Sequence, residues 1–302
     1  MSIIIGTTNT DGTGSSVDLD ENNGTYINDD SSLTWNEDGV TVESDNEDHS
    51  KIDSIIISSD EWNKEGYKEA NLNSEATYID INNVVDVNIV NSTASHFSEI
   101  NVMNAKRGQI DTSNGVSNDV INVGVKSNSD SWSNHFDINS GHGNDEITMT
   151  GIEGSQYTSF SIDAGKGNDT VDVSGMAYAS NADKERHIEG GKGFDTLIAN
   201  GDDTITFEGF EVVQGTGFDQ TLTLDSDALA ANYKPGFGLV VSDIDVEFSD
   251  DVTMVESHDL GMKQVNYLER MGLDSDDYHQ VNVVSDGVEY TILTNDDSFD
   301  IA

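Results

Sequence analysis

The sequence predicts an all-β fold and, within that class, a parallel β-solenoid closed at its C-terminal end by a small cap with one helix. Three observations support this prediction. Short runs rich in Ile and Val are spread over the 302 residues and are separated by Asn, Asp, Gly and Ser. The chain contains 28 Gly and 1 Pro, which suits many tight turns between strands. A motif of Gly and Asp returns every 24 to 26 residues, and a fixed period of this kind is typical of stacked repeats.

Short apolar runs predict the strands, because each is rich in β-branched residues and is flanked by turn residues. Alternation within a run indicates which side chains face the core: Ile147 and Met149 point inward and Thr148 points outward. The predicted strands are Ile55–Ile57, Tyr78–Ile81, Val84–Val90, Ile100–Met103, Val120–Val125, Ile147–Met149, Val171–Val173, Leu197–Ala199, Ile205–Phe207, Leu222–Leu224, Leu239–Phe248, Val281–Val284 and Tyr290–Leu293.

One segment, His258–Met271, predicts a helix. Apolar residues recur there at three-residue spacing, and Gly272 follows as a helix stop. The spaced residues are Met262, Val265, Leu268 and Met271.

The repeat consists of a strand, a glycine turn that carries an aspartate, and a second strand. Five segments align on the aspartate, and their first glycines are 26, 24, 26 and 24 residues apart. The segments are GVSNDVINV from Gly115, GHGNDEITM from Gly141, GKGNDTVDV from Gly165, GKGFDTLIA from Gly191 and GTGFDQTLTL from Gly215. We therefore divide the chain into an N-terminal acidic, β-rich segment (1–75), a solenoid (76–224) and a C-terminal cap (225–302).

The charge of the chain restricts its function. The 13 Lys and Arg residues against 58 Asp and Glu residues give a net charge of −45. Nucleic-acid binding is excluded, because phosphate contacts need clustered Lys and Arg. The absence of Cys excludes disulfides, thiol catalysis and Cys-based zinc sites. Since no run of 18 apolar residues occurs, we expect no membrane insertion. Self-repulsion predicts a chain that compacts only when cations neutralise it.

Stacked turns of this composition favour calcium. Carbonyl oxygens of the glycines and one carboxylate from each of two adjacent turns would converge, and six or more oxygen ligands suit Ca²⁺ better than Zn²⁺ or Mg²⁺. The sequence therefore predicts Ca²⁺ as the bound cation. The predicted ligands are Asp119, Gly141, Gly143, Asp145, Gly165, Gly167, Asp169, Gly190, Gly191, Gly193, Asp195, Gly215, Gly217 and Asp219.

These turns resemble the nonapeptide G-G-x-G-x-D-x-U-x of RTX proteins, the hemolysin-type calcium-binding repeats. Gly190–Ile198 fits the whole motif. Gly141–Met149 and Gly165–Val173 also fit, except that Ser140 and Ala164 replace the first glycine. The resemblance implies an RTX-like β-roll or β-helix with calcium-binding turns. RTX nonapeptides usually run in tandem, whereas here each coil has one, so we expect a single row of turns along one edge.

The ends of the chain add an expectation about export. The first residues, MSIIIGTTNTDGTGSS, lack the basic region of a signal peptide. The last residues, Asp300, Ile301 and Ala302, resemble the C-terminal ends of type I secretion substrates, the route that RTX proteins typically take. We therefore expect a bacterial protein that is secreted by the type I secretion machinery and resides extracellularly or at the cell surface.

No catalytic motif stands out, and we expect that the protein is not an enzyme. The sequence contains neither H-E-x-x-H nor G-x-S-x-G. The alternative is a polysaccharide lyase or epimerase on a β-solenoid, for which Lys106–Arg107 and the pair Lys184 and Arg186 would line a sugar-acid groove. Solvated loops are the more ordinary place for such residues. The tryptophans that would stack on sugars, or pack in the core or in loops, are Trp35, Trp62 and Trp132.

The expected function is therefore structural. A small, repeat-based chain without catalytic signature suits an extracellular matrix, biofilm, surface-layer or adhesion component. Its expected partners are calcium ions and either further copies of itself or a cell-surface or matrix polysaccharide.

Overall fold

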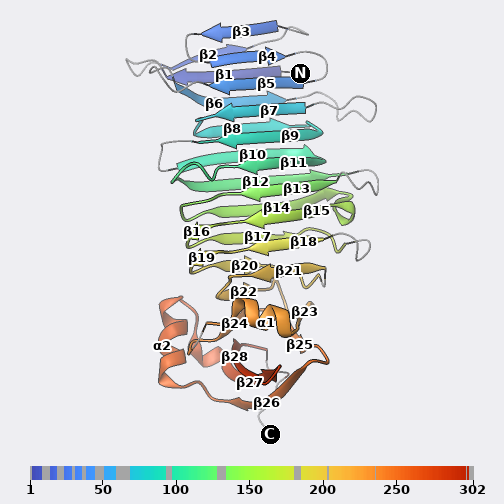
Figure 1. Ribbon diagram of the computed structural model, residues 1–302, viewed down its shortest axis with the longest axis vertical. Helices are drawn as coiled ribbons and strands as arrows, with labels where there is room; N and C mark the ends of the chain where they lie inside the picture. The colour runs from blue at the N-terminus through green and yellow to red at the C-terminus, as the bar shows by residue number, and fades with distance from the viewer. Residues whose placement is uncertain are drawn as a thin grey trace.

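The computed structural model shows a stack of β-coils that runs from the N-terminal strands to a C-terminal cap (Figure 1). It describes residues 69–92, 97–127, 134–179, 185–202, 204–234, 236–296 and 298, together with strands within residues 2–58. Successive coils add one strand to each of two long sheets, so the predicted all-β parallel solenoid is confirmed.

The first long sheet, sheet A, has 14 strands within the described residues. In spatial order they are β2 (Gly14–Asp18), β1 (Ser2–Thr8), β6 (Lys51–Ser58), β8 (Tyr78–Asn82), β10 (Phe97–Ala105), β12 (Asn118–Lys126), β14 (Glu146–Glu153), β17 (Thr170–Gly175), β20 (Thr196–Ile198), β22 (Val212–Gln214), β24 (Leu239–Ser242), β28 (Val288–Thr294), β27 (His279–Ser285) and β26 (Val252–His258).

The second long sheet, sheet B, has 10 strands within the same part of the chain. They are β21 (Ile205–Glu208), β18 (Arg186–Glu189), β15 (Ser159–Asp163), β13 (His135–Asn139), β11 (Arg107–Asp111), β9 (Asp86–Asn91), β7 (Glu69–Ser74), β5 (Gly39–Ser44), β4 (Ser31–Trp35) and β3 (Gly24–Asn28). Two small parallel pairs complete the strands: β16 (Lys166–Gly167) with β19 (Lys192–Gly193), and β23 (Thr221–Leu224) with β25 (Asp245–Phe248).

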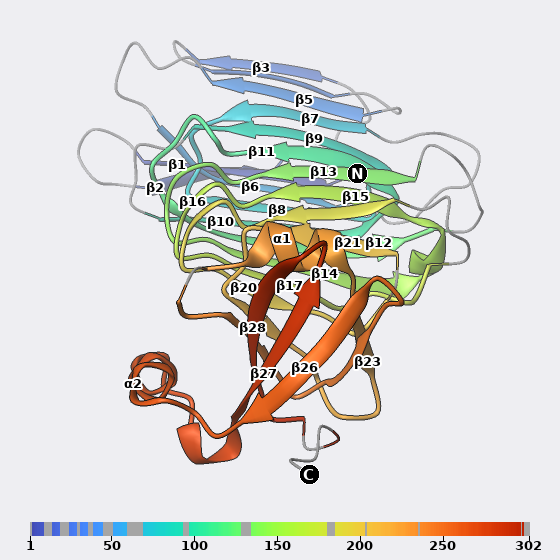
Figure 2. The same cartoon turned by 60° about the horizontal axis from the view of Figure 1, so that its bottom comes forward.

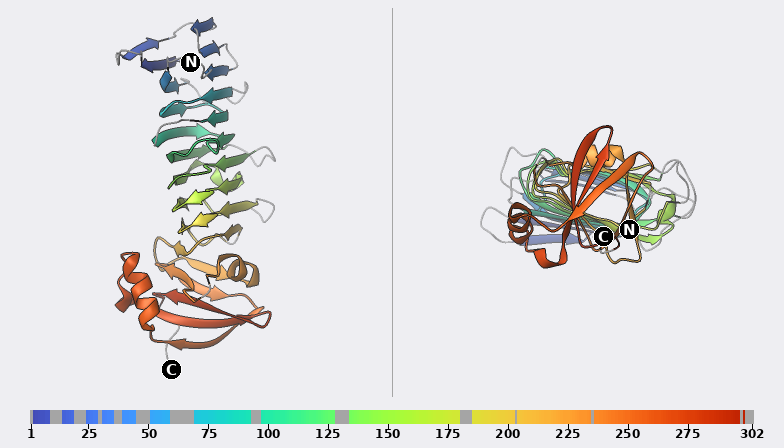
Figure 3. Two further views of the ribbon diagram at one scale, coloured as in Figure 1. Left: turned by 60° about the vertical axis from the view of Figure 1, so that its left-hand side comes forward. Right: turned by 90° about the horizontal axis from the view of Figure 1, so that it is seen from below.

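The core lies between the two sheets and repeats from coil to coil (Figure 3). In sheet A, Ile121 lies opposite Ile147, and Ile147 lies opposite Val171. In sheet B, Phe136 lies opposite Phe160. All five side chains are buried, and burial of such a side chain stabilises the fold by about 1.5–3 kcal/mol. Because one coil has no covered faces of its own, this stabilisation depends on stacking.

The C-terminal cap closes the stack in two ways. Sheet A continues from β24 to β28, which pairs with it in parallel. Strands β28, β27 and β26 then pair antiparallel with one another and cross the end of the stack in Figure 2. Helix α1 (Ser226–Asn232) covers the free edge of β21. The buried side chain of Asn232 accepts a hydrogen bond from Phe210 N (2.9 Å) and donates one to the carbonyl of Phe207 (3.0 Å). The sequence analysis did not predict α1, although Asp225 caps its first turn.

Helix α2 (Met262–Arg270) confirms the predicted helix over a shorter range, and Gly272 follows it with a φ of 79°. Leu268 is its one fully buried residue, whereas Met262 is 83% exposed, so the predicted apolar spacing does not describe the packed face. The helix packs on the outer face of sheet A. It therefore buries side chains of the last strands that point away from the main core. That outer cluster contains Val212, Val240 and Leu293.

Two predicted strands differ from the structure. The run Leu239–Phe248 forms β24 and β25 instead of one strand, because Asp243 between them has a φ of 57°. The run Val84–Val90 contributes a strand only from Asp86. Hydrogen bonding crosses both predicted segment boundaries, through β6 with β8 and through β22 with β24, so the division into three segments stays a prediction from sequence pattern. Within the described residues, no helix is long and apolar enough to cross a membrane.

Candidate metal centre

Four of the predicted aspartates form a ladder along one edge of the solenoid. Asp119 is the second residue of β12, and the other three lie directly before strands of sheet A, so coil stacking places all four above one another. The backbone N–H of Asp119 donates to Oδ1 of Asp145 (2.8 Å). The N–H of Asp145 donates to Oδ1 of Asp169 (2.8 Å), and that of Asp169 to Oδ1 of Asp195 (2.9 Å). We call Asp119, Asp145, Asp169 and Asp195 the aspartate ladder.

The ladder continues by one residue at each end. The N–H of Asp195 donates to Oε2 of Glu211 (2.8 Å), so a glutamate occupies the next position. At the other end, the hydroxyl of Ser98 donates to Oδ1 of Asp119 (2.6 Å). Glu211 was not among the predicted ligands, although it precedes β22 as Asp195 precedes β20.

The ladder carboxylates are buried and only half satisfied. Their residues are between 0% and 2% exposed. Each uses Oδ1 in the ladder, while its Oδ2 atom is buried without a hydrogen-bond partner. Burial is the main cause that raises the pKa of Asp145 to about 6, of Asp169 to about 7 and of Asp195 to about 6. Neighbouring ladder carboxylates raise the pKa of Asp169 further. Since an unpaired buried polar atom costs free energy, this row of oxygens favours a proton or a cation at each position.

A second ladder of asparagines lies beside the first. Oδ1 of Asn118 accepts a hydrogen bond from Asn144 N, and Oδ1 of Asn144 accepts one from Asn168 N, both at 2.8 Å. Oδ1 of Asn168 accepts the next one from Phe194 N (3.0 Å), where the asparagines end. In the aspartate ladder each N–H donates to the following coil, whereas in the asparagine ladder each N–H donates to the preceding coil. The donors of the two ladders therefore connect each coil to both neighbours. The repeated Asn-Asp pair was the sequence signal for this second ladder.

The predicted glycines of the middle coils form the turns that lead into the ladder. Their φ values are positive, and adjacent turns pair through the backbone: Lys166 N donates to the carbonyl of Gly141 (2.8 Å), and Lys192 N donates to that of Gly165 (2.8 Å). At Gly167, φ is 147°, and an added Cβ would lie 1.4 Å from the carbonyl oxygen of Gly143. The turns therefore stack at backbone contact. The glycines of this row are Gly141, Gly143, Gly165, Gly167, Gly191 and Gly193, and Gly190 precedes the last pair.

The fifth predicted segment is out of register with the other four. Thr196 lies opposite Val212, so the coil after Asp195 is shorter than the predicted period and its ladder position falls on Glu211. Asp219 lies in the loop between β22 and β23, outside the ladder. The glycines of the same segment, Gly215 and Gly217, lie in that loop as well. The aligned glycines misled the sequence analysis, because the shortened coil has no motif of its own.

The ladder can supply two carboxylates to a cation between adjacent coils. Among the described residues, no group of three or more His, Asp or Glu side chains lies close enough to hold a metal ion. A cation would therefore take further oxygens from backbone carbonyls or water. Carboxylates, carbonyls and water are the ligands that Ca²⁺ accepts, and its flexible coordination tolerates such a mixed set.

Two of the four basic residues considered for a sugar-acid groove, Arg186 and Arg107, have structural partners. Arg186 is buried in the core opposite Phe160 and pairs with Asp202 at 2.5 Å, which corrects its placement on a solvated loop or in a groove. Arg107 pairs with Asp86 of the adjacent strand at 2.7 Å.

Several other predicted features cannot be compared with the fold. The side chains of Trp35, Trp62 and Trp132 lie outside the described residues, as do Lys184 and the C-terminal residues 300–302.

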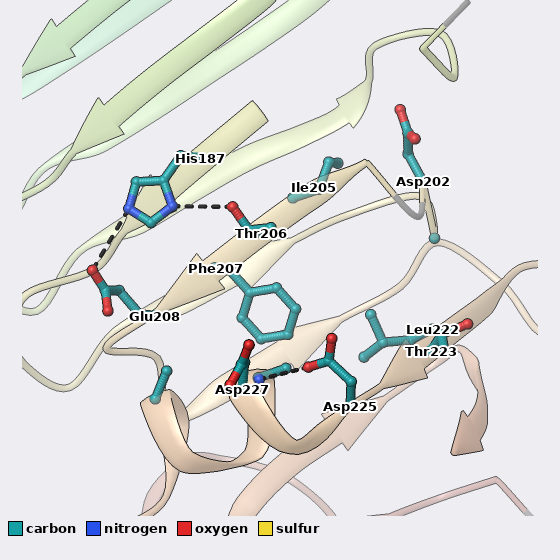
Figure 4. A pocket seen from close by; sticks show the side chains of 13 residues that line it. His187, Asp202, Ile205, Thr206, Phe207, Glu208, Leu222, Thr223, Asp225 and Asp227 are labelled. Carbon is teal, nitrogen blue, oxygen red and sulfur yellow. Dashed lines mark hydrogen bonds and ion pairs between the residues drawn. The ribbon is translucent and has the colours of Figure 1, made fainter. Parts of the chain in front are cut away.

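An acidic pocket of about 440 Å³ lies between β21 and α1 (Figure 4). Its polar groups already serve the fold. Asp225 accepts a hydrogen bond from Ala228 N as the cap of α1 (2.8 Å), and Asp202 pairs with Arg186. His187 contacts Thr206 through Nδ1 at 3.1 Å. These contacts give Asp225, Asp202 and His187 structural roles.

Fold and site together define a class of protein: a parallel β-solenoid with one row of stacked acidic turns along an edge. Comparison of the chain with family models, with curated proteins and with solved structures finds no match.

Proposed function

We propose that this protein is a secreted, calcium-binding structural β-solenoid of the RTX type, which folds on Ca²⁺ outside the cell and then self-associates. The observation that carries the proposal is the row of four buried carboxylates whose Oδ2 atoms have no hydrogen-bond partner. Cations bound there would neutralise the most costly charges of a chain whose net charge is −45. The role is that of a matrix, surface-layer or adhesion component and not that of a catalyst.

Within this proposal, Ca²⁺ lies between adjacent coils and takes Oδ2 atoms of the aspartate ladder as ligands. The cation supplies charge neutralisation and links each coil to the next. Extracellular modules bind Ca²⁺ with dissociation constants of about 10⁻⁴–10⁻³ M, which would leave such sites empty at cytosolic calcium levels. A ligand that binds only the folded state stabilises it by about 2.7 kcal/mol at a hundredfold excess over Kd. Several sites of this strength suffice to fold a chain that is otherwise unfolded.

The test is a calcium titration of the purified chain followed by circular dichroism. We expect a coil spectrum in chelator and a β spectrum at millimolar Ca²⁺, with Mg²⁺ at the same concentration and ionic strength as the control. A full β spectrum in excess chelator contradicts calcium-coupled folding. Equal effects of Ca²⁺ and Mg²⁺ contradict a specific site and leave only charge screening.

A further inference from the structure

A second pocket, of about 640 Å³, lies between α2 and the outer face of sheet A. This size is in the range of small-molecule and cofactor sites, about 300–1,000 Å³. The pocket begins where the asparagine ladder ends, because Phe194 replaces asparagine there and lines it. We call it the α2 pocket, and it plays no part in the proposed calcium sites.

Three aromatic side chains form its apolar wall. The rings of Phe194 and Tyr267 meet edge to face at 6.2 Å, and those of Phe237 and Tyr267 are 4.7 Å apart. Aromatic rings of this kind offer an apolar body against which the C–H face of a sugar ring can pack. Gln214 adds an amide that can donate and accept hydrogen bonds.

The positive charge of the last third of the chain gathers at the same pocket. After Lys192 the sequence contains 24 Asp and Glu residues but only three Lys and Arg residues: Lys234, Lys263 and Arg270. Lys234 and Arg270 line the pocket, and Lys263 Nζ lies 4.4 Å from the centroid of the Phe237 ring. Such convergence in an acidic chain favours an anionic ligand.

Of the two cations that line the pocket, one is available to that ligand. Lys234 is engaged with Glu211, its Nζ lying 2.9 Å from Oε1. Among the described residues, Arg270 has no ion pair, and its side chain is exposed at the pocket. A guanidinium binds a carboxylate through two parallel hydrogen bonds.

Tyr267 contributes an unsatisfied hydroxyl. Its oxygen is buried and has no hydrogen-bond partner among the described residues. Burial, with a smaller contribution from Glu211, raises the pKa of this phenol, so it stays protonated at neutral pH and can donate. A buried hydroxyl without a partner is costly, and a ligand oxygen would relieve that cost.

From these contacts we infer that the α2 pocket binds an acidic polysaccharide, a chain of hexuronic acid sugars. One sugar ring packs against the aromatic wall, its carboxylate pairs with Arg270, and a ring hydroxyl reaches Tyr267. The inference deepens the proposed matrix role by naming the partner class, and it rests on that role only for its biological setting.

The test is isothermal titration of the full chain, at constant millimolar Ca²⁺, with a trimer of galacturonic acid. A neutral trisaccharide and a short glutamate peptide serve as comparison ligands. We expect binding of the uronate trimer, with the neutral trisaccharide at least about tenfold weaker, since a charge-assisted pair is lost. Equal binding of acidic and neutral sugars, no binding of the uronate, or tighter binding of the peptide overturns the inference.

Variants separate the site from general charge effects. Arg270→Gln should lower the affinity for the uronate about tenfold, and Tyr267→Phe, which keeps the ring, about threefold. Lys126→Gln removes a cation from the distant strand β12 and should leave the affinity unchanged. If Arg270→Gln and Lys126→Gln have the same effect, the assigned contact is wrong.

Circular dichroism of the same samples distinguishes this inference from the calcium proposal. A chain that folds with Ca²⁺ but does not bind the uronate overturns only the α2 pocket. A chain that is folded in chelator and still binds the uronate overturns only calcium-coupled folding.

Discussion

At the scale of single residues, the ladder aspartates combine a structural role with the proposed binding role. Oδ1 of Asp169 accepts a hydrogen bond that connects two coils, whereas its Oδ2 has no partner. An asparagine at this position would keep the acceptor and remove the buried charge. The two roles can therefore be separated by substitution.

The first prediction concerns Asp169→Asn. Calcium affinity should fall at least about tenfold, because a charged ligand is lost. Asp172→Asn is the control: Asp172 lies in β17 next to the ladder, and its Oδ1 accepts from the N–H and the hydroxyl of Ser174. Calcium titration and thermal unfolding of both variants give the comparison. Equal losses of affinity would refute the assigned ligand.

The second prediction concerns pH. In the folded chain the pKa values of Asp145, Asp169 and Asp195 are raised from 3.8 to about 6, 7 and 6. At a pH between the unfolded and the folded pKa values, the folded chain therefore binds more protons than the unfolded chain. Their stabilising contribution is therefore fully present below about pH 4, declines as pH rises, and is lost above about pH 7.

Thermal unfolding at the lowest Ca²⁺ concentration that keeps the chain folded should accordingly show a melting temperature that falls from pH 5 to pH 8. Calcium should reduce the fall, because the cation replaces the proton at the carboxylates. Since other carboxylates also titrate, the informative quantity is the difference between variants. Asp169→Asn should have a shallower slope than Asp172→Asn, and parallel slopes would contradict a raised pKa at Asp169.

At the scale of the elements, the coil turns depend on close backbone stacking. Gly167 combines a positive φ with a carbonyl oxygen at the place of a Cβ, whereas Gly287, in the turn between β27 and β28, has a φ of 76° and open space around it. A comparison of the two glycines therefore separates the cost of the backbone conformation from the cost of the close stacking. The turn of Gly167 is held between two others, and the turn of Gly287 is not.

The third prediction follows from this pair. Gly287→Ala should cost about 1–2 kcal/mol, the usual cost of a left-handed conformation with a Cβ. Gly167→Ala should cost several kcal/mol more, because adjacent coils must separate locally. Urea unfolding at saturating Ca²⁺ measures both changes. Similar costs would show that the stacked turns adapt without separation of the coils.

At the scale of the whole molecule, we expect the ends of the sheets to control association. Helix α1 covers the edge of sheet B, but the last strand of sheet A, β26, is an edge strand that exposes Met254 (47%) and Val255 (54%). An exposed apolar edge strand is a template for pairing with another chain. Repulsion between acidic chains opposes such pairing until Ca²⁺ neutralises them.

The fourth prediction is calcium-dependent association through this edge. The wild-type chain should form reversible oligomers or filaments at high Ca²⁺, and Val255→Lys should keep it monomeric. Val116→Lys, at an exposed turn residue of the solenoid, is the control and should associate like the wild type. Light scattering across a calcium titration measures particle size. A monomeric wild type at all calcium concentrations would contradict the proposed matrix role, and equal association of both variants would exclude β26.

The fold class and the position of the ladder could be predicted from the amino-acid sequence. Alternating residues such as Ile147 and Met149 specify which side of a strand is buried, and a constant period specifies that coils stack. Asp145 and Asp169 could be aligned for the same reason. These properties are local or periodic, so they are visible in one chain read in order.

The end of that period, and the contacts beyond it, depend on packing in three dimensions. Glu211 takes the next ladder position because the coil there is shorter, which no residue of the motif announces. Arg186 is buried because Asp202, from the loop before the next strand of sheet B, neutralises it. The α2 pocket arises where Phe194 and Tyr267, far apart in sequence, meet. The physical reason is common to these cases: each depends on contacts between coils or between coil and cap, and their partners are set by packing and not by local spacing.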